Sequence, residues 1–489
     1  MAEIDRARLL ESVPTELFIG GKWAPARDRS TFEVVDPASE EVLARVADAD
    51  GEDGIAALDA AVDAAAGWAA TPPWKRADLI RASYDAILAR RDEIATLITL
   101  EMGKPLAEAR GEVGYGATFF RWFSESASRL HLEGAYGTEP GGEYKVMTYK
   151  RPVGPTLLVT PWNFPLAMGT RKIGAALAAG CTVVMKPAEQ TPLTMLLLAE
   201  VMREAGLPDG VLNVITTSDA PGVVARIMAD PRLRKISFTG STQVGKLLLG
   251  QAAEGVLRSS MELGGNSPLV VFDDADIDAA VDGATMAKMR NGGESCVAAN
   301  RIYVQSGVLE EFTTKLAERL ASFRAGHGLD EGVTLGPLID GEQRSKVVRL
   351  VDDAVAKGAS VVIGGQVPSG TGYFYPPTVL RDVPRDAAMR DEEIFGPVAA
   401  IYPFDTEREA IEQANDTPYG LASYLFTRDL SRAVRVAEAL DTGITGVNRG
   451  VVSNPAAPFG GIKESGLGRE GSSEGIEEYL ETKYIGLQL

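Results

Sequence analysis

The sequence predicts an α/β protein built from two Rossmann-type domains, each a parallel sheet covered by helices. The chain has 489 residues, enough for roughly three domains of ordinary size. From about residue 156 onward, short apolar runs alternate with helical segments, which is the pattern of a buried parallel sheet. The alternation restarts near residue 268, after a Gly-Gly-Asn junction at residues 264–266. We therefore expect the two domains to meet at this junction.

The part of the chain before residue 153 follows another pattern. Thr31–Val35 is typical of a strand. Residues 55–129 repeat Ala, Leu and Ile every three or four positions, which predicts helices. Gly and Pro cluster at residues 134–142 and end the helical pattern. Glu143–Arg151 alternates apolar and polar residues, so we expect a strand there.

Each of the two series supplies strands and helices in turn. The expected strands and helices of the first series are Thr156–Thr160, Pro165–Ala179, Cys181–Met185, Pro192–Ala205, Val211–Ile215, Pro221–Met228, Lys235–Phe238 and Thr242–Gln251. Those of the second series are Pro268–Phe272, Ala275–Met289, Arg301–Val304, Leu309–Phe323, Ser345–Lys357 and Ser360–Ile363.

The charge balance argues against two classes of partner. The 49 Lys and Arg residues against 68 Asp and Glu residues give a net charge of −19. Binding to nucleic acid or to an anionic membrane depends on a positive field, so neither is expected as the main function. The N-terminus lacks the apolar core of a signal peptide. The longest uncharged run, residues 152–170, contains four prolines and cannot form one continuous helix. We expect a cytoplasmic protein.

Cysteine and histidine are scarce, and this limits the possible chemistry. The chain has two of each: Cys181, Cys296, His131 and His327. A disulfide framework and a zinc site with several His or Cys ligands are therefore excluded, and no metal is expected. Cys181 begins an apolar run and is interpreted as a small buried hydrophobe. Cys296 lies in a polar, glycine-rich loop, where a reactive thiol and a structural one are equally plausible.

Two glycine motifs could bind phosphate. Residues 240–246 (Gly-Ser-Thr-Gln-Val-Gly-Lys) follow an expected strand and open an expected helix, as in a P-loop. Leu247 stands where a Ser or Thr would hold magnesium, which disfavours nucleotide hydrolysis. Two interpretations remain: a structural turn, or a binding site for the diphosphate of a dinucleotide. Residues 466–471 match a dinucleotide fingerprint, but no apolar strand precedes them, so a tight glycine loop is the better interpretation.

Seven motifs together resemble the aldehyde dehydrogenase superfamily, from about Thr15 to the end of the chain. They occur in the order of that family, at residues 160–165 (TPWNFP), 185–189 (MKPAE), 238–242 (FTGST), 261–265 (MELGG), 290–297 (the Cys296 loop), 392–397 (EEIFGP) and 458–461 (PFGG). The resemblance implies an NAD(P)-dependent oxidation of an aldehyde to a carboxylic acid. It also implies an aldehyde dehydrogenase-like fold with a small β arm for oligomerisation.

The resemblance assigns three catalytic residues. The thiolate of Cys296 attacks the aldehyde to give a thiohemiacetal, which hydride loss converts to a thioester. Asn163 and the backbone N–H of Cys296 hold the oxyanion. Glu262 is the general base for the water that releases the acid; alone, this residue would be interpreted as a capping or salt-bridged glutamate. The presence of a general base favours transfer of the acyl group to water over its transfer to coenzyme A.

The resemblance also assigns the cofactor contacts, which are Trp162, Lys186, Glu189, Gly240, Ser241, Gly264, Glu393 and Phe395. Lys186 and Glu189 would contact the adenosine ribose. A carboxylate there accepts hydrogen bonds from both ribose hydroxyls and repels a 2′-phosphate. We therefore expect NAD to be preferred, with NADP possible.

The substrate residues resemble those of the succinate-semialdehyde dehydrogenase branch. There Arg171, Arg290 and Ser453 would hold the distant carboxylate of the aldehyde, and guanidinium pairs with carboxylate through two parallel hydrogen bonds. Four positions leave alternatives open: Met289 in place of phenylalanine, Ala298 in place of a second cysteine, Glu294 in place of glutamine, and Arg449 in the loop near Ser453. The alternatives are glutarate semialdehyde, a broad range of aldehydes, or a non-catalytic homologue that keeps only the fold.

The resemblance further divides the chain. Residues 1–129 and 153–264 would form the dinucleotide-binding domain, and residues 265–468 the catalytic domain. Residues 130–152 and 469–489 would form the arm, in which the expected strand 143–151 and the segment 479–487 complete the sheet of a partner. A homodimer or homotetramer is expected.

Overall fold

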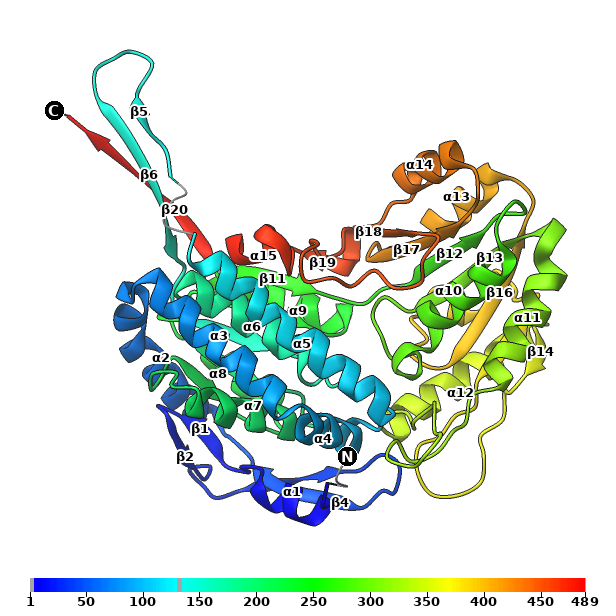
Figure 1. Ribbon diagram of the computed structural model, residues 1–489, viewed down its shortest axis with the longest axis horizontal. Helices are drawn as coiled ribbons and strands as arrows, with labels where there is room; N and C mark the ends of the chain where they lie inside the picture. Colours follow the sequence, from blue (N-terminus) through cyan, green and yellow to red (C-terminus); the bar gives the residue numbers. More distant parts are fainter. Residues whose placement is uncertain (1–3, 130–133, 489) are drawn as a thin grey trace.

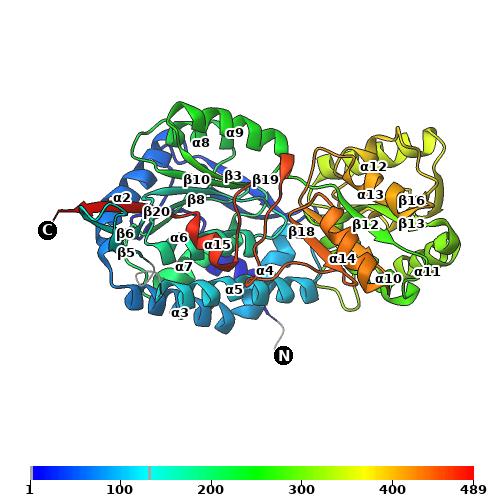
Figure 2. The same cartoon turned by 90° about the horizontal axis from the view of Figure 1, so that it is seen from above.

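The computed structural model describes residues 4–129 and 134–488 and contains two large sheets (Figure 1). The first sheet has eight strands and the second has seven. Figure 2 shows the two α/β bodies side by side. The chain passes from one body to the other between β11 (Arg258–Glu262) and β12 (Ser267–Val271). In the described part of the chain, no helix is long and apolar enough to cross a membrane.

Five parallel strands form the centre of the first sheet, and antiparallel strands extend both edges. Across the sheet the order is β19 (Gly466–Leu467), β11, β10 (Lys235–Thr239), β7 (Thr156–Val159), β8 (Val183–Lys186), β9 (Leu212–Val214), β1 (Leu17–Ile19) and β2 (Lys22–Ala24). Residues 466–471 are thus an edge strand and a turn, not the strand-to-helix unit of a dinucleotide fingerprint.

Helices cover both faces of this sheet because its central strands are apolar on both sides. In β7, Leu157 packs with helices α2, α8 and α9, whereas Leu158 packs with the core on the opposite face. The helices are α1 (Arg6–Ser12), α2 (Gly51–Ala70), α3 (Pro73–Ala89), α4 (Arg91–Met102), α5 (Leu106–Ala127), α6 (Ala167–Ala179), α7 (Leu193–Glu204), α8 (Ala220–Met228) and α9 (Thr242–Glu254). Strands β3 (Thr31–Val35) and β4 (Val42–Ala47) pair separately.

The second sheet is built in the same way. Its order is β14 (Ser360–Ile363), β15 (Thr378–Arg381), β16 (Val398–Phe404), β13 (Ala299–Gln305), β12, β17 (Ala422–Phe426) and β18 (Ile444–Val447), and only β14 is antiparallel to its neighbour. Its helices are α10 (Ile277–Met289), α11 (Leu309–Ala321), α12 (Gly341–Ala356), α13 (Glu407–Asn415) and α14 (Leu430–Ala439). A short helix, α15 (Ser472–Glu477), packs on the first body.

A three-stranded sheet projects from the first body (Figure 1). It joins β5 (Tyr136–Thr138), β6 (Lys145–Pro152) and β20 (Leu480–Leu487), with β6 antiparallel to both neighbours. The strands expected at residues 143–151 and 479–487 therefore pair with each other. Residues 130–133, which include His131 and begin the expected arm, lie outside the described residues.

Candidate active site

Cys296 lies in the loop between α10 and β13, after a short 3₁₀ segment, Arg290–Gly293. The loop packs closely against the domain junction, because a Cβ added to Gly265 would lie 2.5 Å from the carbonyl oxygen of Cys296. Burial raises the pKa of the Cys296 thiol to about 12, against the positive charge of Arg171. At neutral pH Cys296 is therefore a thiol, and it would have to lose its proton before it could act as a nucleophile.

Asn163 stands at the end of β7 and is buried. Its side-chain nitrogen donates to the backbone oxygen of Glu294 (3.1 Å), in the nucleophile loop. One N–H of the amide is thus used to fix its orientation, and the second remains for an oxyanion. The backbone oxygen of Asn163 accepts hydrogen bonds from Asn291 (2.9 Å) and Lys104 (2.9 Å). Both the side chain and the backbone of Asn163 are therefore held in place.

Lys104 and Glu112 form a buried ion pair behind Asn163. Lys104 Nζ lies 2.5 Å from Glu112 Oε2, and both side chains are 1% exposed. Glu112 also accepts from the backbone N–H groups of Leu166 and Ala167, where α6 begins. The ion pair thus joins α5, the start of α6 and the oxyanion residue. No local motif marked Lys104 or Glu112 in the sequence.

Glu262 ends β11 and is 4% exposed. Its Oε2 atom has no hydrogen-bond partner among the described residues. Burial raises the pKa of Glu262 well above its ordinary value, and the negative charge of Glu470 adds to the effect. A buried carboxyl oxygen without a protein partner is a position for a water molecule. This is the arrangement that a general base needs.

Glu470 is the centre of a second buried ion cluster, which the sequence did not indicate. It pairs with Arg171 (3.0 Å) and Lys172 (2.6 Å), and these two side chains are 2% and 0% exposed. Lys172 also donates to Ser237 (2.9 Å). Although burial opposes ionisation, Lys172 and Arg171 hold the pKa of Glu470 below its ordinary value. Arg171 is therefore not on a solvated helix face, which was the alternative to a functional role.

A cavity of about 190 Å³ joins Cys296 to most of the expected cofactor contacts. Its lining includes Trp162, Asn163, Gly240, Ser241, Gly264, Cys296, Glu393 and Phe395. The rings of Trp162 and Phe395 meet edge to face, with centroids 5.4 Å apart. Lys186 and Glu189 lie outside this lining, at the end of the adjacent strand β8, and pair at 3.3 Å. The expected ribose contacts are therefore next to the cavity rather than in it.

The helix N-termini around the first sheet differ in their caps. Carboxylates accept from the first N–H groups of α6, α7 and α8, supplied by Glu112, Glu101 and Asp219 respectively. The cap of α9 is the neutral hydroxyl of Ser241, which accepts from Val244 (3.3 Å). Helix N-termini attract anions, and a side-chain carboxyl group that already accepts from the first N–H groups occupies that position. Of these four helices, only α9 has no side-chain carboxyl group at its N-terminus.

Residues 393–395 reach the same cavity from the second body. Glu393 accepts from the backbone N–H of Gly265 (3.3 Å), and burial raises its pKa to about 7, against Lys346. Phe395 has a positive φ of 54°, which is unusual for a bulky residue. Gln343 of α12 donates to the backbone oxygen of Phe395 (2.5 Å) and holds this conformation. Such held strain is common in ligand sites.

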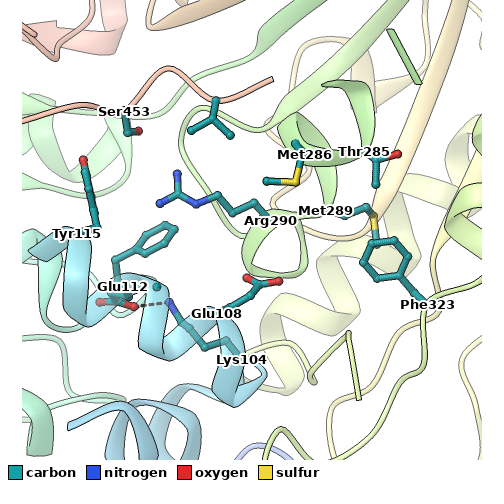
Figure 3. Close-up of a pocket in the computed structure, with 13 residues that line it drawn as sticks. Lys104, Glu108, Glu112, Tyr115, Thr285, Met286, Met289, Arg290, Phe323 and Ser453 are labelled. Carbon is teal, nitrogen blue, oxygen red and sulfur yellow. Dashed lines mark hydrogen bonds and ion pairs between the residues drawn. The ribbon is translucent and has the colours of Figure 1, made fainter. Parts of the chain in front are cut away.

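A second cavity, of about 420 Å³, opens beside the nucleophile loop (Figure 3). Arg290, Ser453, Tyr115 and Phe164 are among its lining residues. A narrow pocket lined by the same four residues, together with Arg171 and Cys296, continues inward. The three expected substrate residues thus meet around the approach to the nucleophile.

The two arginines differ in their electrostatic state. Arg171 is paired with Glu470, and its Nη2 donates to the hydroxyl of Tyr115 (2.5 Å). Arg290 has no hydrogen bond or ion pair to any of the described residues. Its guanidinium lies 5.0 Å and 5.7 Å from the ring centres of Phe164 and Tyr115. Arg290 is therefore the cation that remains available for an anionic ligand.

Glu294 and Cys181 are both buried, and each makes a hydrogen bond to the backbone. Glu294 is 1% exposed and accepts from the backbone N–H of Ile339 (3.1 Å), and burial raises its pKa well above the ordinary value. Its side chain does not line the substrate cavity or the narrow pocket. Cys181 is fully buried, and burial raises its pKa to about 11. Its thiol donates to the backbone oxygen of Tyr479 (3.4 Å), as suits a structural cysteine.

The chain is similar to known proteins over nearly its whole length. Residues 23–485 match the model of the aldehyde dehydrogenase family. The chain is 56% identical over 446 residues to a succinate-semialdehyde dehydrogenase from Paenarthrobacter nicotinovorans, which covers 91% of this chain and 99% of the relative. It is 48% identical over 470 residues to a glutarate-semialdehyde dehydrogenase from Pseudomonas putida, covering 96% and 97%. A crystal structure of an NADP-dependent enzyme from E. coli superposes with a TM-score of 0.97, at 47% identity and full coverage of both chains. The chain belongs to the aldehyde dehydrogenase family.

Proposed function

We propose that the protein oxidises a carboxylated aldehyde, succinate semialdehyde, to the dicarboxylic acid succinate with a nicotinamide dinucleotide. The observation that carries the proposal is the unpaired guanidinium of Arg290, which faces Ser453 in the cavity that leads to Cys296. A guanidinium binds a carboxylate through two parallel hydrogen bonds and remains charged. The relative with 56% identity, named a succinate-semialdehyde dehydrogenase, supports the same substrate.

In the first step, the Cys296 thiol would give its proton to the Glu262 carboxylate, which releases it to solvent, and the sulfur attacks the aldehyde carbon while the carbonyl oxygen gains a negative charge. The free N–H of Asn163 and the backbone N–H of Cys296 would stabilise that charge. A donor of this kind typically contributes about 3 kcal/mol to the transition state. Hydrogen bonds with Glu294 and Lys104 fix the orientation of Asn163 before the reaction, so little reorganisation is needed during it.

The residues that line the cavity of about 190 Å³ would hold the nicotinamide dinucleotide, which would supply the hydride acceptor. Loss of hydride from the thiohemiacetal carbon would leave an acyl thioester on Cys296. Glu262 then takes a proton from a water molecule whose oxygen attacks the thioester carbon. The carbon–sulfur bond breaks, the carboxylic acid leaves, and the thiol of Cys296 is restored. The raised pKa of Glu262 makes its carboxylate a stronger base than an ordinary glutamate, which suits this step.

For the cofactor we favour NAD over NADP. Glu189 lies beside Lys186 at the end of β8, where the adenosine ribose would lie if the pyrophosphate binds at α9. The carboxylate would accept from both ribose hydroxyls and would repel a 2′-phosphate. The residues fit a dinucleotide because α9 offers a neutral N-terminus and the cavity between the two bodies is lined from both sides.

Glutarate semialdehyde is the second candidate substrate. It carries the same carboxylate one methylene further from the aldehyde. A relative named for this substrate shares 48% of its residues with the chain. One methylene group typically changes discrimination by about 1–3 kcal/mol. The proposal therefore predicts a preference between the two semialdehydes, not exclusion of the longer one.

The test is a screen that follows the absorbance of the reduced nicotinamide. Succinate semialdehyde, glutarate semialdehyde, butanal and pentanal would each be assayed with NAD and with NADP. The proposal predicts the highest kcat/KM for succinate semialdehyde with NAD. Equal kcat/KM for butanal would contradict the carboxylate preference. No turnover of any aldehyde would favour a non-catalytic homologue, and Cys296→Ala provides the inactive control.

We also propose that the chain forms a homodimer or homotetramer through the arm. Strand β20 is paired on one side only, and β18 is an edge strand of the second sheet. Edge strands offer unpaired N–H and C=O groups to another chain. In this proposal residues 130–152 and 469–489 serve assembly, residues 1–129 and 153–264 bind the dinucleotide, and residues 265–468 carry the nucleophile. Light scattering of the full chain would determine the number of copies.

A further inference from the structure

Tyr115 of α5 lies between the two arginines of the substrate cavity. The guanidinium carbons of Arg171 and Arg290 are 5.9 Å and 5.7 Å from the centre of its ring. Its hydroxyl accepts a hydrogen bond of 2.5 Å from Arg171. Tyr115 lines both the open cavity and the narrow pocket that reaches Cys296. Tyr115 therefore contacts Arg171, which is paired with Glu470, and also faces the cavity that Arg290 lines.

The hydroxyl hydrogen of Tyr115 is free to be donated. A phenol group has one donor hydrogen and can also accept. Arg171 can only donate, so in this contact the hydroxyl is the acceptor and its hydrogen must point elsewhere. Within the described part of the chain, no hydrogen bond from this hydroxyl to an acceptor is found. Figure 3 shows the hydroxyl of Tyr115, the hydroxyl of Ser453 and the guanidinium of Arg290 around the same space.

We propose that Tyr115 is a specificity-determining residue that donates its hydroxyl hydrogen to the distant carboxylate of the substrate. The inference rests on the proposed function, in which Arg290 and Ser453 bind the same carboxylate. A hydroxyl that accepts from a cation becomes a stronger donor, because successive hydrogen bonds polarise one another. The positive charge of Arg171 would thus strengthen the hydrogen bond from Tyr115 to the substrate carboxylate, while Arg171 stays paired with Glu470.

Tyr115→Phe tests the inference because it removes the hydroxyl and keeps the ring. The measurement is the ratio of kcat/KM for succinate semialdehyde to kcat/KM for butanal, which has the same length but no carboxylate. Loss of a hydrogen bond to a charged group predicts a fall of about tenfold in this ratio. Succinate should also become an about tenfold weaker competitive inhibitor of butanal oxidation. Any general effect of the lost Arg171 contact acts on both aldehydes and cancels in the ratio.

The matched control is Tyr84→Phe. Tyr84 lies in α3 and, like Tyr115, packs against an arginine, with Arg81 at 5.2 Å from its ring centre. It does not line either cavity, so the ratio should stay at the wild-type value.

The outcomes separate the inference from the proposed function. If the wild-type enzyme does not prefer succinate semialdehyde to butanal, the proposed function fails. If the wild type has the preference and Arg290→Ala loses it, but Tyr115→Phe keeps it within twofold, only the inference about Tyr115 fails. Equal losses with both aldehydes would also overturn it, because they would show that the hydroxyl merely supports the cavity wall.

Discussion

The two arginines near the substrate cavity should respond very differently to substitution by alanine. Arg290→Ala removes a cation that has no hydrogen bond or ion pair to the described residues and that attracts Glu108 in the same cavity. Its contacts with the rings of Phe164 and Tyr115 contribute about 1 kcal/mol to stability. The loss of its pairing with a substrate carboxylate should cost about 1.5–3 kcal/mol of binding. This corresponds to a fall of roughly 10- to 150-fold in kcat/KM for succinate semialdehyde.

Arg171→Ala removes one member of a buried ion cluster. Breaking a buried pair by removing one partner costs about 3–5 kcal/mol of unfolding free energy. Because Lys172 remains 2.6 Å from Glu470, we expect the lower end of this range. The cost should appear as a lower melting temperature, and turnover should fall for all aldehydes.

The assay combines thermal unfolding with steady-state kinetics on succinate semialdehyde and butanal for both variants. Arg290→Ala should keep a near-wild-type melting temperature and lose activity with the semialdehyde alone. Arg171→Ala should lose stability and should lose activity with both aldehydes. The reasoning would be refuted if Arg171→Ala were as stable as the wild type, or if Arg290→Ala impaired butanal as strongly as the semialdehyde.

Three other substitutions test separate parts of the site. Glu189→Ala should raise the ratio of kcat/KM with NADP to that with NAD about tenfold, because the carboxylate no longer repels a 2′-phosphate; an unchanged ratio would place the ribose elsewhere. In the wild type, kcat should rise with pH at values above those at which an ordinary glutamate titrates, since burial raises the pKa of Glu262 and only its carboxylate accepts a proton; Glu262→Gln should lack this rise, because it cannot activate water to release the thioester. Lys104→Met should lower kcat more than it changes KM, because the backbone of Asn163 loses a donor, and a parallel melting curve should show the instability of an unpaired Glu112.

The fold was predictable where the strands are buried on both faces. The apolar run Thr156–Thr160 corresponds to β7 at Thr156–Val159, and Lys235–Phe238 to β10. Strand β11 was missed because Arg258, Ser259 and Ser260 are polar. Long-range contacts give two of these side chains their partners: Arg258 donates to the backbone oxygen of Leu480 (2.7 Å), and the buried Ser260 donates to Glu478 (2.9 Å). Local patterns cannot show that a polar side chain will meet a partner more than 200 residues away.

The candidate site, like the fold, was only partly predictable from the sequence. Cys296 and Asn163 lie in motifs, and the structure brings both into one cavity. Glu470 was not found, because its contact with Arg171 spans 299 positions in the chain. The sequence therefore suggested two equivalent arginines, whereas only the structure distinguishes the paired one from the available one.

The protein has a net charge of −19, yet both ligands of the proposed reaction are anions. The positions of its carboxylates explain how it can bind them. Screening confines charge effects to about 10 Å at ordinary salt, so the local environment decides which anions bind. Glu101, Glu112 and Asp219 occupy three helix N-termini of the first sheet, which leaves the neutral cap at Ser241 for the pyrophosphate. Glu470 pairs with both Arg171 and Lys172, so each of these cations already has a carboxylate partner in the protein. Arg290 has no such pair among the described residues, so selectivity for the anion depends on where this acidic protein places its own carboxylates.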